Sequence, residues 1–193
     1  MINVQKYRTI KAKYGHVASW ALWSESASAD TSDIGIFDDH LVPLYRLHAR
    51  FVFVGLNISQ PIAESRPFGN FHGGKRDFML RDAIKGTSLE GAYMTDLIKL
   101  FPDPSAASVV KHFKKNPHQL NFHLTELHSE LNNVGADDET TLIALGNDCF
   151  SFLSEHVCDR NILKLTHYAA TISKVKYRDE VNSVLSGLVS SRS

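Results

Sequence analysis

The sequence predicts an α/β protein, a three-layer α/β/α sandwich with a central, mainly parallel, four-stranded sheet. Four short apolar runs, each bounded by turn-forming residues, alternate along the chain with longer segments of helical periodicity. The first and third runs are continuous apolar segments, as in strands covered by helices on both faces. Strands that alternate with helices pair in parallel through right-handed crossovers, so two helical layers enclose the sheet.

The predicted strands are residues 51–54, 91–95, 141–145 and 162–165. The predicted helices are residues 75–84, 105–115, 120–134, 147–156 and 175–189. The clearest helix has apolar residues at steps of three and four from Leu120 to Val134, and Gly135 supplies its C-terminal stop. Ser105 is the expected N-cap of the preceding helix.

Residues 1–45 are expected to form an N-terminal arm that packs on or flanks a domain of residues 46–193. The arm mixes aromatic residues, including Trp20 and Trp23, with basic residues and has no clean periodicity. Residues 24–33 are small and polar and cannot bury much surface, which predicts a mobile loop.

The amino-acid composition limits the classes of protein to which this chain can belong. The chain has 193 residues, of which 43% are hydrophobic and 22% charged, as in one globular domain. Lys and Arg number 21, as do Asp and Glu, so any contact with nucleic acid depends on a local basic patch. The two cysteines, Cys149 and Cys158, lack the spacing of a metal site, so we expect no metal, cofactor or iron–sulfur cluster.

The start of the chain has no apolar run behind a basic stretch, so no signal peptide is expected. No segment approaches the ~20 apolar residues of a membrane span. We therefore expect a cytoplasmic monomer without a membrane contact.

The residues that follow each predicted strand are the candidates for a binding site. In open α/β sheets, ligands bind beyond the carboxyl ends of the strands. This rule alone nominates Asn57, Asp96, Asn147 and His167 as neighbours.

The same strand ends carry a resemblance to a known family. Gly55-Leu56-Asn57 resembles the first signature of the uracil-DNA glycosylase superfamily, and Thr166-His167-Tyr168 resembles the second, a His after the last strand. Segments 70–78, 93–97 and 142–147 resemble the intervening motifs, and the order fits over about residues 50–180. The motifs are closest in style to the mismatch-specific, thymine-DNA glycosylase branch. Ile58-Ser59 and Tyr168-Ala169 stand where the family carries Pro-containing turns.

The resemblance implies a DNA glycosylase, a DNA-repair hydrolase that flips a modified or mispaired base from DNA and excises it. Such a reaction needs a donor for the departing base and a polar group that holds water. His167 would be the donor, Asn57 would position water, and Phe71 or Phe68 would stack on the base. The implied substrate-binding residues are Gly55, Leu56, Ser59, Phe71, Asp96, Asn147 and Tyr168. The implied DNA-binding residues are the apolar wedge Ile172 and the basic residues Lys174, Lys176, Arg178 and Arg76.

Asp96 stands where the family reads the edge of the base. An ionised carboxylate accepts hydrogen bonds and cannot donate them. It would favour an exocyclic amine or a ring N–H and repel the O4 carbonyl of uracil. We therefore expect a substrate other than plain uracil.

Other interpretations of the same residues stay open. Asn57 could cap the next segment, Asp96 could cap a helix or pair with Lys99, and His167 could be an ordinary core histidine. A first alternative function is a module that binds nucleic acid or a nucleotide in this pocket without cleavage. A second is a protein-interaction or host-defence module in which Trp20 and Trp23 contact the partner. Removal of residues 1–24 would then leave the domain folded.

Overall fold

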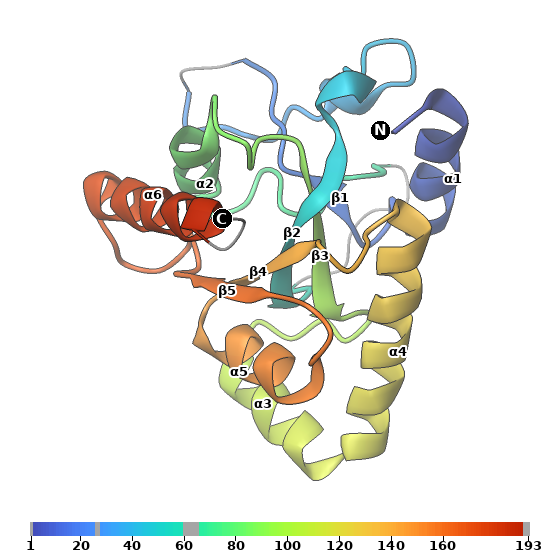
Figure 1. The fold of residues 1–193 in the computed structure, drawn as a ribbon, viewed down its shortest axis with the longest axis vertical. Helices are drawn as coiled ribbons and strands as arrows, with labels where there is room; N and C mark the ends of the chain where they lie inside the picture. The colour runs from blue at the N-terminus through green and yellow to red at the C-terminus, as the bar shows by residue number, and fades with distance from the viewer. Residues whose placement is uncertain (1, 26–27, 60–65, 191–193) are drawn as a thin grey trace.

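The computed structural model describes residues 2–25, 28–59 and 66–190, which form one sheet between two helical layers (Figure 1). The predicted α/β/α sandwich is confirmed, but the predicted number of strands is wrong, because the sheet has five strands in the order β1-β3-β2-β4-β5. The strands are β1 (Ser19–Trp20), β2 (His48–Asn57), β3 (Ala92–Ile98), β4 (Thr141–Leu145) and β5 (Ile162–Leu165).

The central strand β2 organises the sheet. It pairs in parallel with β3 on one side and with β4 on the other, and β4 pairs in parallel with β5. The additional strand β1 pairs antiparallel with β3. Because the register places Gly55 beside Asp96, two predicted site residues are direct neighbours across β2 and β3.

Six helices cover the two faces of the sheet in the described part of the chain. They are α1 (Val4–Tyr14), α2 (Phe78–Ile84), α3 (Ala106–Lys115), α4 (Pro117–Val134), α5 (Asn147–His156) and α6 (Lys174–Ser190). Helices α2 and α6 pack on one face, whereas α1, α3, α4 and α5 contribute to the apolar core on the other (Figure 1).

Capping residues in the sequence predicted two of the helix ends correctly. Ser105 caps α3 as predicted, because its Oγ accepts a hydrogen bond from the Ser108 N–H at 3.2 Å. Gly135 ends α4 with φ of 85°, and its N–H donates to the last carbonyls of the helix. Helix α2 begins later than predicted, at Phe78, because the chain before it turns sharply and Arg76 has φ of 69°.

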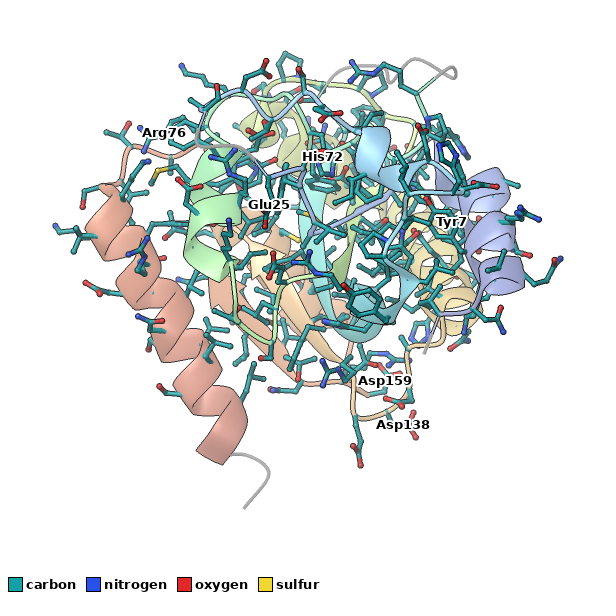
Figure 2. All side chains as sticks on the ribbon, turned by 90° about the horizontal axis from the view of Figure 1, so that it is seen from above. Tyr7, Glu25, His72, Arg76, Asp138 and Asp159 are labelled. Atoms are coloured by element: carbon teal, nitrogen blue, oxygen red, sulfur yellow. The ribbon has the colours of Figure 1, made fainter. Side chains whose placement is uncertain are left out.

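The N-terminal segment belongs to the core. Trp20 is fully buried, and its ring lies 4.8 Å from that of Tyr93. Tyr7 points from α1 into the interior, as Figure 2 shows, and its hydroxyl donates to a backbone carbonyl. Trp23 is 7% exposed. The alternative in which Trp20 and Trp23 contact a partner is therefore not supported, because both side chains are buried.

The segment predicted as a mobile loop is in part packed. Thr31 is 4% exposed and donates a hydrogen bond from its hydroxyl to the carboxylate of Asp77. The same hydroxyl accepts from the N–H of Gly73 at 3.2 Å. Residues 26–27 of this segment lie outside the described residues.

A helix that crosses a membrane must be both long and apolar. None of the described helices combines sufficient length with sufficient apolar character to cross a bilayer.

Replacement of Trp20 tests whether the N-terminal segment is part of the folding unit. We expect Trp20→Ala to lower the free energy of unfolding by about 3–5 kcal/mol, because it empties a packed aromatic site. Removal of residues 1–24 should then prevent folding, contrary to the expectation from sequence. Tyr45→Ala is the control, because Tyr45 is 80% exposed. Urea unfolding followed by circular dichroism measures both, and equal midpoints for the two substitutions would contradict the assignment.

Candidate functional site

A cavity of about 410 Å³ lies at the carboxyl ends of the parallel strands. The segments that follow β2, β3, β4 and β5 all contribute to its wall, as expected for an open α/β sheet. Eight of the nine residues predicted as catalytic or substrate-binding line it: Leu56, Asn57, Ser59, Phe71, Asp96, Asn147, His167 and Tyr168. Asn57 and His167, which are far apart in the chain, thus face one cavity.

The side-chain amide of Asn57 has a fixed orientation. Its Nδ2 donates to three backbone carbonyls, those of Ile58 at 3.0 Å, Phe101 at 3.2 Å and Asp103 at 2.9 Å. The flipped amide would place Oδ1 against the same three oxygens, which is unfavourable. No described residue donates to Oδ1 of Asn57, so this oxygen remains available to accept a hydrogen bond. The nitrogen therefore holds the loop after β3 and does not cap the next segment, whereas the oxygen is left for the cavity.

The tautomer of His167 follows from its hydrogen bond. The backbone N–H of Ala169 donates to Nδ1 of His167 at 3.2 Å. Because Nδ1 is the acceptor, the proton of the neutral ring lies on Nε2. Burial lowers the pKa of His167, so the imidazole is neutral at physiological pH. His167 therefore offers a neutral N–H donor at the cavity, and the interpretation as a sealed core histidine is wrong.

Asp96 and Gly55 form the floor of the site. Asp96 is 3% exposed, and its Oδ2 accepts a hydrogen bond from Nδ2 of Asn70 at 2.8 Å. Its Oδ1 lies over Gly55, where a Cβ would overlap with it. Gly55 is therefore required by the close approach of the carboxylate.

Burial raises the pKa of Asp96 to about 7. The Asn70 amide and the Lys99 ammonium lower it in part, and Glu130 raises it further. The protonated acid can donate a hydrogen bond, which the ionised form cannot. With the pKa raised in this way, Asp96 can act as a donor as well as an acceptor near neutral pH.

The predicted pairing of Asp96 with Lys99 takes another form. Nζ of Lys99 donates to the backbone oxygen of Asp96 at 2.7 Å, whereas its ion pair is with Glu130, also at 2.7 Å. The carboxylate of Asp96 therefore accepts its hydrogen bond from Asn70 and lines the cavity.

The two candidate stacking residues have different environments. Phe71 lines the cavity, and Cε1 of its ring lies 3.3 Å from the position of a Cβ on Gly55. Its φ of 67° is unusual for a bulky residue and costs about 1–2 kcal/mol. Phe68 is fully buried against Tyr7 and Trp20, so the suggestion that it stacks on a base is wrong.

The remaining wall comes from β4, α5 and the segment after β5. Oδ1 of Asn147 accepts from Nζ of Lys164 at 3.1 Å. Tyr168 is 9% exposed, and burial raises the pKa of its hydroxyl. Its ring centroid lies 4.4 Å from that of His167, which limits how the imidazole can turn.

The predicted DNA-binding residues lie around the start of α6. Ile172 packs partly against the apolar core, and its carbonyl accepts from the Arg76 guanidinium at 2.6 Å (Figure 2 labels Arg76 beside this segment). Lys174 pairs with Asp82 at 3.2 Å. Lys176 and Arg178 are exposed. Only the last two combine exposure with no ion pair among the described residues.

Sequence reasoning missed several residues of the cavity. Asn70 orients Asp96, and its position directly before Phe71 in the resembling segment was the available signal. Asp103 and Asp148 also line the cavity, and Oδ1 of Asp103 accepts a hydrogen bond from the N–H of Ser105 at 2.7 Å. Asp103 arrives through a long loop after β3, which no sequence pattern places.

Within the described residues, no cluster of three or more His, Cys, Asp or Glu side chains could hold a metal ion. A comparison of the sequence with protein-family models found no matching family. A comparison with curated proteins found no match either.

The raised pKa of Asp96 predicts a specific dependence of stability on pH. The folded state holds the proton more tightly than the unfolded chain, whose value is 3.8, so the contribution of Asp96 is lost as the pH rises to about 7. Asp96→Asn should gain stability relative to the wild type across this window, at up to ~1.4 kcal/mol per pH unit.

Urea unfolding of both proteins at several pH values measures this difference. The comparison with Asp96→Asn is needed because two histidines act in the opposite sense. Burial lowers the pKa of His48 to about 4 and that of His72 to about 3, so their contribution to stability increases as the pH rises. A difference that does not change with pH would show an ordinary pKa for Asp96.

Proposed function

We propose that this protein is a base-excising glycosylase that hydrolyses the N-glycosidic bond of a modified or mispaired base in DNA. The observation that carries the proposal is the convergence of two polar groups in fixed orientations on one cavity. Asn57 presents an acceptor oxygen and His167 presents a neutral N–H donor. The motif resemblance of the same strand ends also supports the proposal.

The donor of His167 matches the charge that develops in this reaction. When an N-glycosidic bond breaks, the sugar becomes oxocarbenium-like and the base departs with negative charge. An oriented N–H beside the leaving base stabilises that charge without reorganisation. A neutral imidazole suffices for this purpose, and the lowered pKa of His167 keeps the ring neutral.

The acceptor of Asn57 suits the other half of the reaction. Its free oxygen can hold a water molecule by accepting one of its hydrogen bonds. An amide is a weak base, so proton removal falls to a carboxylate or follows bond cleavage. Asp103 and Asp148, which line the same cavity, supply such carboxylates.

Asp96 and Phe71 provide the recognition elements. A base that stacks on Phe71 would present its edge to the carboxyl group of Asp96, which lies at the floor of the same cavity. The ionised form accepts from an amine or ring N–H, and the protonated form can also donate to a carbonyl of the base. Base preference should therefore shift with pH around the pKa of about 7.

One observation also suits the non-catalytic alternative. The amide nitrogen of Asn57 is fully committed to the loop that carries Phe101 and Asp103, so part of its role is structural. Binding of a base without cleavage uses the same cavity. Product formation separates the two functions.

A panel of oligonucleotides with different damaged and modified bases tests the proposal. Treatment with alkali cuts the strand wherever a base has been removed. We expect one class of base to be excised, and His167→Ala to lower the single-turnover rate by about 10²–10³-fold, because an oriented donor is lost.

His156→Ala is the matched control, since His156 is exposed at the C-terminal end of α5 and lies outside the cavity. It should retain the wild-type rate, and both variants should keep the wild-type unfolding midpoint. Tight binding with no abasic product from any oligonucleotide would reject the enzyme and select the binding module.

A further inference from the structure

A second hollow, here called the aromatic groove, lies on the other side of the loop that borders the cavity. Its volume is about 550 Å³, and it lies between the end of α1, the loop 99–104 and the first half of α4. Two large apolar side chains in its lining are exposed, Leu100 at 76% and Phe122 at 62%. Nothing in the cavity chemistry described above uses either of them.

Leu100 has a strained backbone conformation, and its exposed side chain gains little packing energy in compensation. Its φ of 58° lies in the left-handed region, which costs a non-glycine residue about 1–2 kcal/mol. Its neighbours hold it there: the N–H of Lys99 donates to Nδ1 of His123 at 3.4 Å, and the carbonyl of Phe101 accepts from Asn57. Strained backbone conformations that persist in this way cluster at binding and active sites.

The groove and the cavity share one wall. Phe101 faces the groove and Asp103 lines the cavity, and both carbonyls accept hydrogen bonds from Nδ2 of Asn57. A strand whose target base occupies the cavity would therefore carry the next nucleotides across this loop into the groove.

The chemistry of the groove suits unpaired nucleotides. The exposed ring of Phe122 offers a flat apolar face, and bases stack on such rings irrespective of sequence. Lys13, His16 and His118 provide a positive charge and N–H donors, whereas Glu126 is the one carboxylate among the lining residues. Since Nδ1 of His123 accepts from Lys99, its Nε2 carries a proton that can donate to a phosphate.

We propose that the aromatic groove binds the unpaired nucleotides that flank the target base, so that the substrate is single-stranded nucleic acid or a locally melted duplex. This inference rests on the proposed function, because the position of the groove across the loop 99–104 from the cavity matters only if a base enters the cavity. Bases within an intact duplex are stacked on each other and cannot reach Phe122 or Leu100.

Fluorescence anisotropy with a labelled, undamaged single-stranded oligodeoxynucleotide tests the groove. Phe122→Ala should weaken binding by about tenfold, since a stacking platform is lost. Leu100→Gly should weaken it by about fivefold and leave the unfolding midpoint unchanged or higher, because Gly adopts a positive φ without strain. Binding of the matching duplex should be weaker and unaffected by either substitution. A single-stranded oligoribonucleotide in parallel shows whether the groove distinguishes RNA from DNA.

Tyr45→Ala and Leu41→Ala are the matched controls, because both side chains are exposed and lie outside the groove. They should bind the single strand as the wild type does. Affinity that is unchanged in Phe122→Ala and Leu100→Gly would overturn the proposal and leave a protein as the occupant of the groove. A lower unfolding midpoint in Leu100→Gly would also overturn it, since Leu100 would then be structural.

The outcome is separable from that of the proposed function. His167→Ala should abolish base removal and leave the affinity for undamaged single strands intact. If the wild type excises no base while the groove variants lose affinity, the proposed glycosylase activity is rejected and the groove is supported as a nucleic-acid-binding surface. If bases are excised while the groove variants bind normally, the groove fails alone.

Discussion

The amide of Asn57 ties the end of the central strand to the loop after β3, and the shape of the site depends on this connection. One nitrogen supports three carbonyls, of which two belong to residues 101 and 103 of that loop. The loop thereby becomes the common wall of the cavity and of the aromatic groove. The same hydrogen bonds turn the oxygen of Asn57 away from the loop. A structural role and a chemical role are thus combined in a single side chain, with one polar atom for each.

The ionisation of Asp96 follows from how the charges around β3 are shared. Glu130 is fully buried on the other face of the strand, and its carboxylate accepts from the hydroxyls of Tyr93 and Thr95. Lys99 forms its ion pair with Glu130 and therefore neutralises that group. Asp96 is left with a neutral amide donor from Asn70, which compensates burial less well than a cation does. Protonation is therefore the least costly way to remove the buried charge of Asp96.

The features that depend on neighbouring residues in the sequence could be predicted from it. The alternation of runs predicted the layers, Ser105 and Gly135 predicted helix ends, and the strand-end rule brought Asn57 and His167 together. Strand β1 escaped prediction because a pairing of two residues leaves no periodic signal. The burial of Trp20 and the protonation of Asp96 depend on groups that meet only in the folded chain. Neither the tautomer of His167 nor the left-handed conformation of Leu100 has any signature in composition or spacing.

The loop before α2 carries Asn70 and Phe71 and contains most of the left-handed non-glycine residues in the described chain: Phe68, Phe71 and Arg76. Such a conformation persists only when its surroundings determine it.

Those surroundings are largely the N-terminal segment. The N–H of Phe68 donates to the carbonyl of Gly15, and the amide of Asn70 donates to that of Val17 at 2.9 Å. The hydroxyl of Ser19 donates to the carbonyl of Phe68 at 2.8 Å. Residues that resemble an accessory arm in sequence therefore fix the position of both recognition elements. It follows that the site cannot be assigned to residues 46–193 alone, because the orientation of Asp96 and Phe71 is set through Asn70 by the first strand and the residues before it.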